Sequence, residues 1–281
     1  MSPPAAALAR VTRTARVTRT ARERPSTQMR RARHAPLGRC MYCLAPGGPG
    51  VLLTEEHLVP RALGGRPTLR DAVCEPCRRI TGRREQLTLD REFAVPRTLL
   101  ALKRRRARAP GPSRLPAVAL EGAADAPVTL PVDAFPRTFA LPVFGRASLL
   151  AGPDRATTPP RPDFVACTLA LGPVVRRTVA APPPLPDPAA YAHAIAKWAY
   201  ALAVAERGLD CCDMQPMRDL MLGRRDDAFA FVGSAPDRAP PTRQWLHDIA
   251  IDERGGWLVA TLALFASAGM APYEVVLGRL P

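Results

Sequence analysis

One long stretch in the second half of the chain places its apolar residues at helical spacing. The residues that recur in this way are Ala194, Trp198, Ala201, Leu202 and Ala205. Asp187 is a candidate N-cap, Pro188 suits the first helical turn, and Gly208 suits the position just past the end. The pattern therefore predicts a helix over residues 188–207.

Short β-prone runs lie on both sides of this helix. The runs before it, which are broken by prolines, cover residues 118–120, 127–130, 138–144 and 164–171. The runs after it cover residues 245–251, 257–265 and 273–278, and a short helix ending at Gly223 is expected from 216. This mixture predicts an α+β domain over residues 117–281, with a core of its own.

The first 116 residues divide differently. Residues 9–22 contain a six-residue repeat, whose period matches the burial pattern of neither a helix nor a strand, so residues 1–38 are expected to be a disordered basic arm. Residues 39–108 form a compact unit rich in cysteine and arginine. Residues 109–116, which contain Pro and Gly after a run of basic residues, are interpreted as a linker.

The net charge of +15 is concentrated at one end of the chain. Residues 1–39 carry +9, residues 40–115 carry +8, and residues 116–281 carry −2. This distribution favours a polyanion, above all nucleic acid, as the partner of the first part. The alternative is an arginine richness that comes from a GC-rich bacterial genome, but such a bias would not by itself confine the charge to one end.

The compartment decides how the seven cysteines are interpreted. No apolar run reaches the roughly 18 residues of a membrane span, and the basic N-terminus lacks the apolar core of a secretion signal. We therefore expect no membrane partner and a cytoplasmic protein, in which cysteines are thiols or metal ligands rather than disulfides.

Four of the cysteines form two Cys-x2-Cys pairs. The first pair is Cys40 and Cys43, and the second is Cys74 and Cys77. Two such pairs supply the four thiolates that structural Zn²⁺ prefers, and we expect them to hold one zinc ion. The remaining cysteines are interpreted as buried structural thiols; they are Cys167, Cys211 and Cys212.

A set of short motifs surrounds these pairs. EHLVPRALGG (56–65) lies between them, DAVC (71–74) leads into the second pair, and ITG (80–82) and Glu85 follow it. In this order and spacing, residues 40 to about 90 resemble a zinc-knuckle HNH endonuclease of the bacterial type. The resemblance implies a zinc-stabilised ββα unit, with a first strand over residues 52–59, a return loop at Gly64 and Gly65, and a helix from near Cys77 through Glu85.

The same resemblance implies a metal-dependent endonuclease that hydrolyses phosphodiester bonds of nucleic acid, with DNA as the expected substrate. A neutral histidine can take a proton from water near neutral pH, and a divalent metal can neutralise charge on the leaving oxygen. His57 is then the general base, and Asp71 stands where the family has the residue that orients the imidazole. Glu56 is the expected ligand of Mg²⁺ or another divalent metal.

The chain departs from this family pattern at one position. Arg78 follows the second cysteine pair, where a His or Asn commonly binds the catalytic metal, and a guanidinium cannot bind a metal. Glu85, on the same helix face, is the candidate replacement, and Glu55 is a weaker one. The residues expected to contact nucleic acid are Arg78, Arg83, Arg84, Lys103, Arg104, Arg105 and Arg106.

Two other functions stay open beside the nuclease. One is a non-catalytic, zinc-dependent module that binds nucleic acid with a degenerated HNH site, for which Arg78 is the main evidence. The other is a protein-interaction module for an acidic partner. Outside the motifs, His193 is interpreted as a surface or packed residue and His247 as a structural one.

Overall fold

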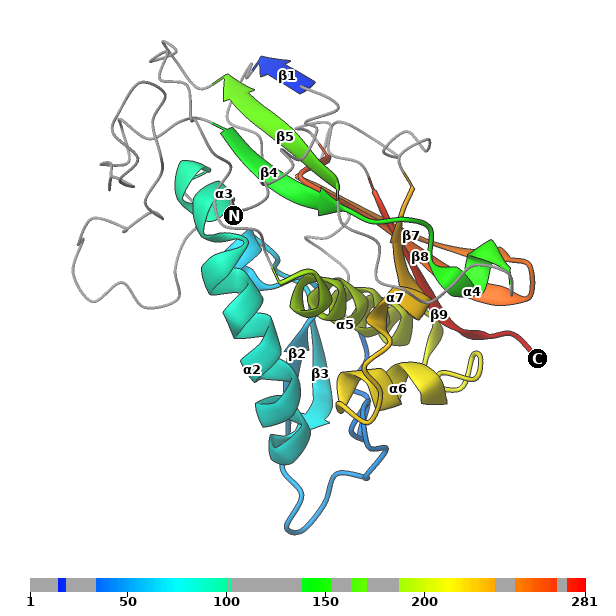
Figure 1. Ribbon diagram of the computed structural model, residues 1–281. Coiled ribbons are helices and arrows are strands. Elements are labelled where there is room, and N and C mark those ends of the chain that lie inside the picture. Colours follow the sequence, from blue (N-terminus) through cyan, green and yellow to red (C-terminus); the bar gives the residue numbers. More distant parts are fainter. Residues whose placement is uncertain are drawn as a thin grey trace, which may run out of the picture.

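The protein mixes helices and strands, as the sequence predicts (Figure 1). The computed structural model describes residues 15–18, 34–100, 102, 138–152, 163–170, 187–235, 246–266 and 272–281. The described elements are β1 (Ala15–Thr18), β2 (Leu53–His57), η1 (Arg61–Leu63), β3 (Thr68–Cys74), α2 (Glu75–Arg91), α3 (Ala94–Leu99), β4 (Thr138–Val143), α4 (Ser148–Ala151), β5 (Asp163–Ala170), α5 (Pro188–Arg207), α6 (Gln215–Met221), α7 (Ala228–Phe231), β6 (Val232–Ser234), β7 (His247–Arg254), β8 (Trp257–Leu264) and β9 (Tyr273–Arg279).

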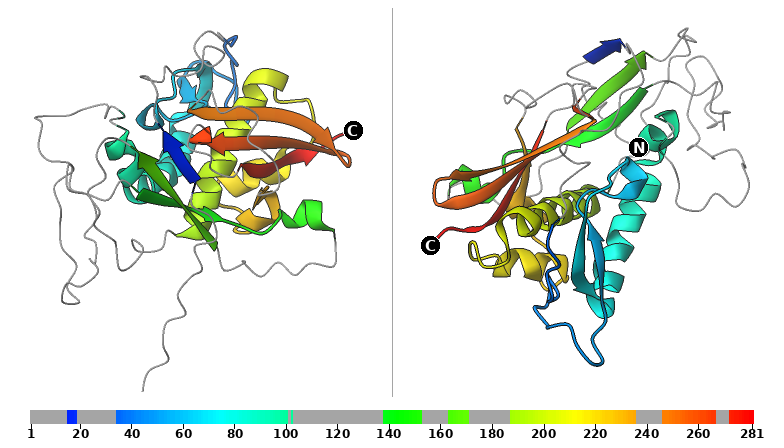
Figure 2. Two further views of the ribbon diagram at one scale, coloured as in Figure 1. Left: turned by 90° about the horizontal axis from the view of Figure 1, so that it is seen from above. Right: turned by 180° about the vertical axis from the view of Figure 1, so that it is seen from behind.

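Helix α5 crosses the middle of the molecule. Figures 1 and 2 show α2 and the β2–β3 hairpin on one side of it and strands β7, β8 and β9 on the other. The helix has the predicted bounds: the carboxylate of Asp187 accepts hydrogen bonds from the N–H groups of Ala189 and Ala190, and Gly208 ends it with a positive φ. All its residues from 191 to 204 are buried, as in helices that are apolar on every side.

Strands β2 and β3 pair antiparallel and lead directly into α2. The loop between them makes a close approach, because a Cβ on Gly65 would lie 1.9 Å from the carbonyl oxygen of Val59. The hairpin also contains a bulge: Thr54 pairs with Val73 and Glu56 pairs with Leu69, so three residues of β3 oppose one residue of β2. The bulge therefore determines which residues of β2 and β3 lie opposite one another.

The C-terminal strands form a four-stranded antiparallel sheet in the order β6-β9-β8-β7. Strands β7 and β8 are joined by Gly255 and Gly256, both with positive φ, as the tight two-residue turn of a hairpin requires. The three predicted C-terminal strands and the short helix before Gly223 are therefore confirmed. Strand β6 was not expected from the sequence.

A second sheet has three strands in the order β1-β5-β4, with β1 parallel to β5. Strand β1 comes from the repeat at residues 15–18, inside the segment expected to be a disordered arm. The rest of that segment up to residue 33 lies outside the described residues, as do the expected linker 109–116 and the β-prone runs at 118–120 and 127–130.

The buried residues form one hydrophobic core that runs across the boundary expected between the two domains. Met41, Leu58 and Phe93, from the first unit, belong to the same cluster as residues of α5 and of the C-terminal sheet. The ring of Phe93 stacks on Tyr191 at a centroid distance of 5.3 Å, and its centroid lies 6.2 Å from that of Phe265. The first unit therefore packs on α5 instead of being separated from the rest. No helix among the described residues combines the length and the apolar character needed to cross a bilayer.

Candidate metal centre and nucleic-acid interface

The four cysteines of the two Cys-x2-Cys pairs meet at one point. The sulfur atoms of Cys40, Cys43, Cys74 and Cys77 all lie within 4.8 Å of one another. The Sγ atoms of Cys43 and Cys74 are 3.7 Å apart. Four sulfurs at the usual zinc–sulfur distance of about 2.3 Å in a tetrahedron stand roughly 3.8 Å from one another, and the distance between Cys43 and Cys74 matches this value.

Local backbone structure explains why the sulfurs converge. In the first pair the N–H of Cys40 donates to the carbonyl of Ala45, and Leu44, with a φ of 65°, donates its N–H to the carbonyl of Cys40. In the second pair Cys74 is the N-cap of α2, so Cys77 lies in its first turn. The positive end of the helix dipole favours thiolates at this position, but burial outweighs it and, with the neighbouring sulfurs, raises the pKa of the Cys74 and Cys77 thiols.

The thiol of Cys40 differs from these two. Burial acts to raise the pKa of the Cys40 thiol, but the backbone N–H groups of Cys43, Cys74 and Tyr42 outweigh it and lower that pKa. The four cysteines could therefore bind a metal such as zinc. The pair Cys211 and Cys212 lies outside this cluster with its sulfurs 3.9 Å apart, and the side chain of Cys167 lies outside the described part.

His57 ends strand β2 and is half-buried. Burial lowers the pKa of its imidazole; the carboxylate of Glu55 opposes this change, and the guanidinium of Arg61 adds to it. The imidazole is therefore neutral at pH 7, the form that can accept a proton. Among the described residues, no side chain forms a hydrogen bond to the ring.

Asp71 does not lie beside His57. His57 pairs with Thr68 across the hairpin, whereas Asp71 lies in the bulge, opposite Glu55. Asp71 is exposed and has a φ of 48°, a left-handed conformation that Asp tolerates better than most residues. The register therefore gives no support to the interpretation of Asp71 as the group that orients the imidazole.

Glu56 and Glu85 do come together, but a third residue holds them. The Nζ atom of Lys197, on α5, lies 2.9 Å from a carboxylate oxygen of Glu56 and 2.9 Å from one of Glu85. The Nε1 of Trp198 also donates to Glu85 at 2.6 Å. The side chains of Lys197 and Glu56 are 3% and 7% exposed, so this ion pair is shielded from water.

The two kinds of charge in this cluster respond differently to burial: burial raises the pKa of Glu56, and Lys197 only partly offsets this. Burial alone would lower the pKa of Lys197, but Glu56 and Glu85 raise it, so the ammonium stays charged. An ammonium ion thus occupies the space between the two carboxylates that were expected to bind a catalytic metal. A divalent cation with Glu56 and Glu85 as ligands does not fit this arrangement, and the sequence reasoning missed Lys197.

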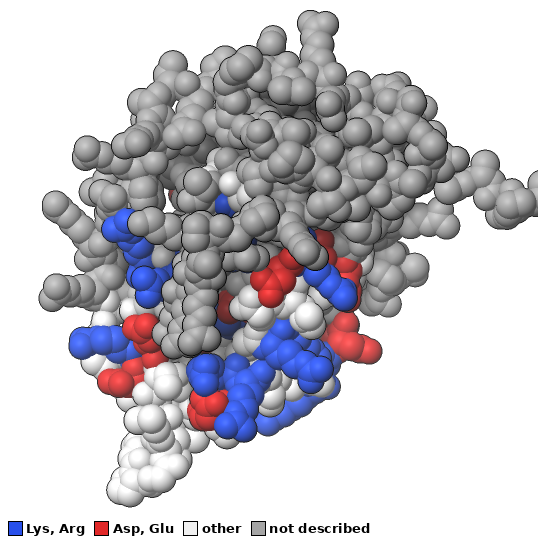
Figure 3. All heavy atoms as spheres, turned by 90° about the vertical axis from the view of Figure 1, so that its left-hand side faces the viewer, with Lys and Arg blue, Asp and Glu red and all other residues white. Residues whose placement is uncertain are grey.

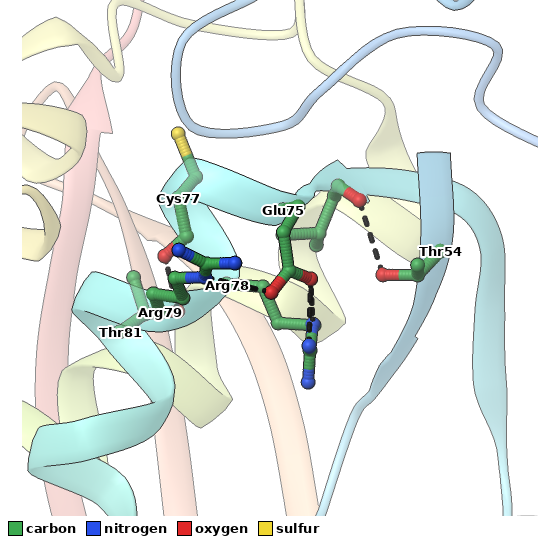
Figure 4. Close-up of polar contacts among 7 residues, drawn as sticks. Thr54, Glu75, Cys77, Arg78, Arg79 and Thr81 are labelled. Atoms are coloured by element: carbon green, nitrogen blue, oxygen red, sulfur yellow. Dashed lines mark hydrogen bonds and ion pairs between the residues drawn. The ribbon is translucent and has the colours of Figure 1, made fainter. Parts of the chain in front are cut away.

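Arg78 lies on the exposed side of α2 and is paired with an acid of its own helix. Its guanidinium donates to Glu75 at 2.7 Å, and Arg79 donates to the other oxygen of that carboxylate at 2.9 Å. Figure 4 shows Glu75 between the two arginines, with the sulfur of Cys77 pointing away from them. These hydrogen bonds from Arg79 and Arg78 lower the pKa of Glu75, which is therefore charged at neutral pH.

The outer face of α2 carries further arginines. Arg83 and Arg84 are exposed, and the guanidinium of Arg84 lies beside Gly223, just after α6. The exposed apolar side chains of Ile80 and Leu87 lie on the same helix. Figure 3 looks onto this side of the molecule and shows basic side chains gathered on its lower part with acidic ones between them. The expected contacts Lys103, Arg104, Arg105 and Arg106 lie outside the described residues.

Comparison with known proteins finds no relative of this chain. No family model matches the chain, and neither a curated protein nor a solved structure is significantly similar to it.

Proposed function

We propose that this chain is a zinc-stabilised nucleic-acid-binding protein whose interface is the outer face of α2. The observation that carries the proposal is the group of exposed arginines along α2, which starts one residue after the cysteine cluster and consists of Arg78, Arg79, Arg83 and Arg84. A zinc ion held by the four cysteines would fix the start of α2 against the β2–β3 hairpin. Guanidinium groups on a fixed helix match phosphate oxygens in charge and in geometry.

Glu75 would compete with a nucleic-acid phosphate for Arg78 and Arg79. Its carboxylate holds Arg78 and Arg79 on the surface, where such pairs contribute little to stability because water screens them. A phosphate of a nucleic acid carries the same charge and can replace the carboxylate as hydrogen-bond acceptor. Glu75 would then act as an internal competitor that weakens binding.

The test is a salt titration of affinity for a short DNA duplex and for a matching RNA. Arg78→Ala and Arg79→Ala should weaken binding, and each should flatten the plot of log affinity against log salt by about 0.9 on B-DNA. Glu75→Gln should strengthen binding, because it frees both guanidinium groups. Arg146→Ala is the control, since Arg146 is an exposed, ion-paired arginine in the other half of the chain. Affinity and salt dependence that are the same in all four variants would contradict the proposal.

A second function is favoured by His57. Its neutral, half-buried imidazole at the end of β2 is suited to take a proton from water, as the general base of an HNH-type endonuclease would. The hairpin followed by α2 has the element order of the ββα unit that this activity uses. Three observations argue against the nuclease: the position of Asp71, the ion pairs of Lys197 and the arginine at position 78.

Cleavage of a supercoiled plasmid separates the two functions. If the protein is a nuclease that uses this site, His57→Ala should lower the rate by about 10²–10⁴-fold while zinc content and DNA affinity stay unchanged. If it only binds, wild type and His57→Ala should both leave the plasmid intact in Mg²⁺ or Mn²⁺. Cleavage by wild type that persists at full rate in His57→Ala would place the activity elsewhere.

A further inference from the structure

The loop that follows the first cysteine pair is uncharged and projects from the molecule. Residues 44–53 have the sequence LAPGGPGVLL, with no charged and no aromatic residue. Figure 1 shows this loop as the lowest point of the molecule, and Figure 3 shows it as an uncharged projection beside basic side chains. Leu52 is 80% exposed, more than any other large apolar side chain in the described part of the chain.

Hydrogen bonds close the tip of this loop. The N–H of Val51 donates to the carbonyl of Gly48 at 3.0 Å, and the N–H of Gly48 donates to the carbonyl of Val51 at 3.3 Å. Pro49 and Gly50 lie between them, and the φ of 85° at Gly50 suits the third position of a type II turn. Leu52 comes directly after this turn, so its backbone is already ordered before a partner binds, which lowers the entropy cost of binding.

Leu52 also lies next to the arginines that would bind phosphate. Leu53 pairs with Cys74, the residue just before α2, so Leu52 lies at the open end of the hairpin beside the first residue of that helix. That first residue is the acid that holds Arg78 and Arg79. An exposed apolar side chain and a pair of guanidinium groups therefore occupy the same end of the molecule.

We propose that Leu52 is an apolar wedge that inserts between neighbouring base pairs of a duplex while the arginines of α2 bind the phosphates beside it. The inference rests on the proposed nucleic-acid binding and adds to it how the duplex is deformed. Leucine is one of the side chains that unstack a base step in this way and kink the duplex. A mismatched step is already weakly stacked and costs less to open, so the protein should prefer it.

A membrane surface is the other partner that an apolar loop beside arginines could suit. Membrane-surface segments bury an extended apolar face, commonly with aromatic residues, in the headgroup region. Here residues 44–53 contain no aromatic residue, and Leu44, the other exposed leucine of the loop, is only 37% exposed. One strongly exposed leucine fits a single base step better than it fits a bilayer.

The experiment compares zinc-loaded, full-length wild type, Leu52→Ala and Leu52→Met on two DNA duplexes that differ only in one central mismatch. A 2-aminopurine next to the mismatch reports unstacking by a rise in fluorescence. Wild type should bind the mismatched duplex more tightly and raise its fluorescence. Leu52→Ala should bind that duplex about tenfold more weakly and without the rise, because the variant lacks most of the inserted side chain.

Two controls separate the wedge from the other contacts. Leu52→Met keeps a large apolar side chain and should behave like wild type. Leu52→Ala should keep the salt dependence and the melting temperature of wild type, since the leucine is uncharged and exposed.

Two results would overturn the wedge alone. One is a Leu52→Ala protein that binds both duplexes and raises the fluorescence as wild type does. The other is binding of wild type to vesicles of phosphatidylcholine and phosphatidylserine that Leu52→Ala abolishes while its DNA binding stays unchanged, which would assign the loop to a membrane surface. A wild type that binds neither duplex at low salt would instead refute nucleic-acid binding itself, and the wedge with it.

Discussion

His247 should make the stability of the fold depend on pH. The side chain is 3% exposed; its Nε2–H donates to the carbonyl of Leu63 at 2.8 Å, and its Nδ1 accepts the N–H of Phe265 at 3.3 Å. Both bonds require the neutral tautomer that carries its proton on Nε2. A second proton on Nδ1 would face the N–H of Phe265, and burial lowers the pKa of His247 to about 4.

The direction of this pH dependence follows from whether the folded or the unfolded chain binds the proton. Below an unfolded-state pKa of about 6.5 the unfolded chain binds a proton that the folded chain refuses until about pH 4. The stabilising effect is therefore complete above about pH 6.5 and is lost as the pH falls toward 4. The free energy of unfolding should drop by about 1.4 kcal/mol per pH unit in this window, or roughly 3 kcal/mol in all, on account of His247.

The assay is urea unfolding of wild type and His247→Gln from neutral pH down to about pH 4, with zinc present. Glutamine can still donate to Leu63, but it does not titrate. The variant should be less stable than wild type at neutral pH, and the difference should shrink by about 3 kcal/mol as the pH falls. His193→Gln should behave alike, because burial also lowers the pKa of His193 to about 4. Parallel stability curves for wild type and His247→Gln would refute the reasoning.

Three further changes test the first unit. Cys74→Ser should remove most of the bound zinc and destabilise the hairpin and α2, as elemental analysis and thermal unfolding would show; full zinc retention would contradict a four-cysteine site. Gly65→Ala should destabilise the loop, because its Cβ would lie 1.9 Å from the carbonyl oxygen of Val59; an unchanged melting temperature would count against that close approach. Tyr200→Phe should cost about 1–3 kcal/mol in urea unfolding, because it leaves the buried carbonyl of Met41 without its hydrogen bond; no loss would show that this bond does not stabilise the fold.

The elements themselves were largely predictable. Asp187 and Gly208 mark the ends of α5 by local chemistry, and the β-prone composition of the C-terminal runs defines three of the four strands of their sheet. The convergence of the four cysteines could also be predicted, because two Cys-x2-Cys pairs supply the four sulfur ligands of a tetrahedral metal site. Each of these features depends on a short stretch of sequence and its immediate neighbours.

The charge cluster and the bulge could not be predicted in this way. The bulge at Asp71 depends on how β3 pairs with β2, and no residue near Asp71 encodes that register. The partners of Glu56 depend on α5, more than 130 residues further along the chain. One signal was present: Lys197 lies in the middle of an otherwise apolar stretch of α5, and a lysine in such a place needs a buried acid. The sequence alone did not say which acid that would be.

The central position of α5 limits how this protein can be cut or recombined. A fragment of residues 39–108 would keep all four cysteines but would lose Lys197, and with it the counter-ion of Glu56 and Glu85. It would also lose Tyr200, whose hydroxyl donates to the carbonyl of Met41 in the first cysteine loop. A zinc unit transplanted into another protein would therefore have to bring α5 with it, although the two segments are separated by the whole middle of the chain. The smallest transferable unit of this architecture is discontinuous in sequence.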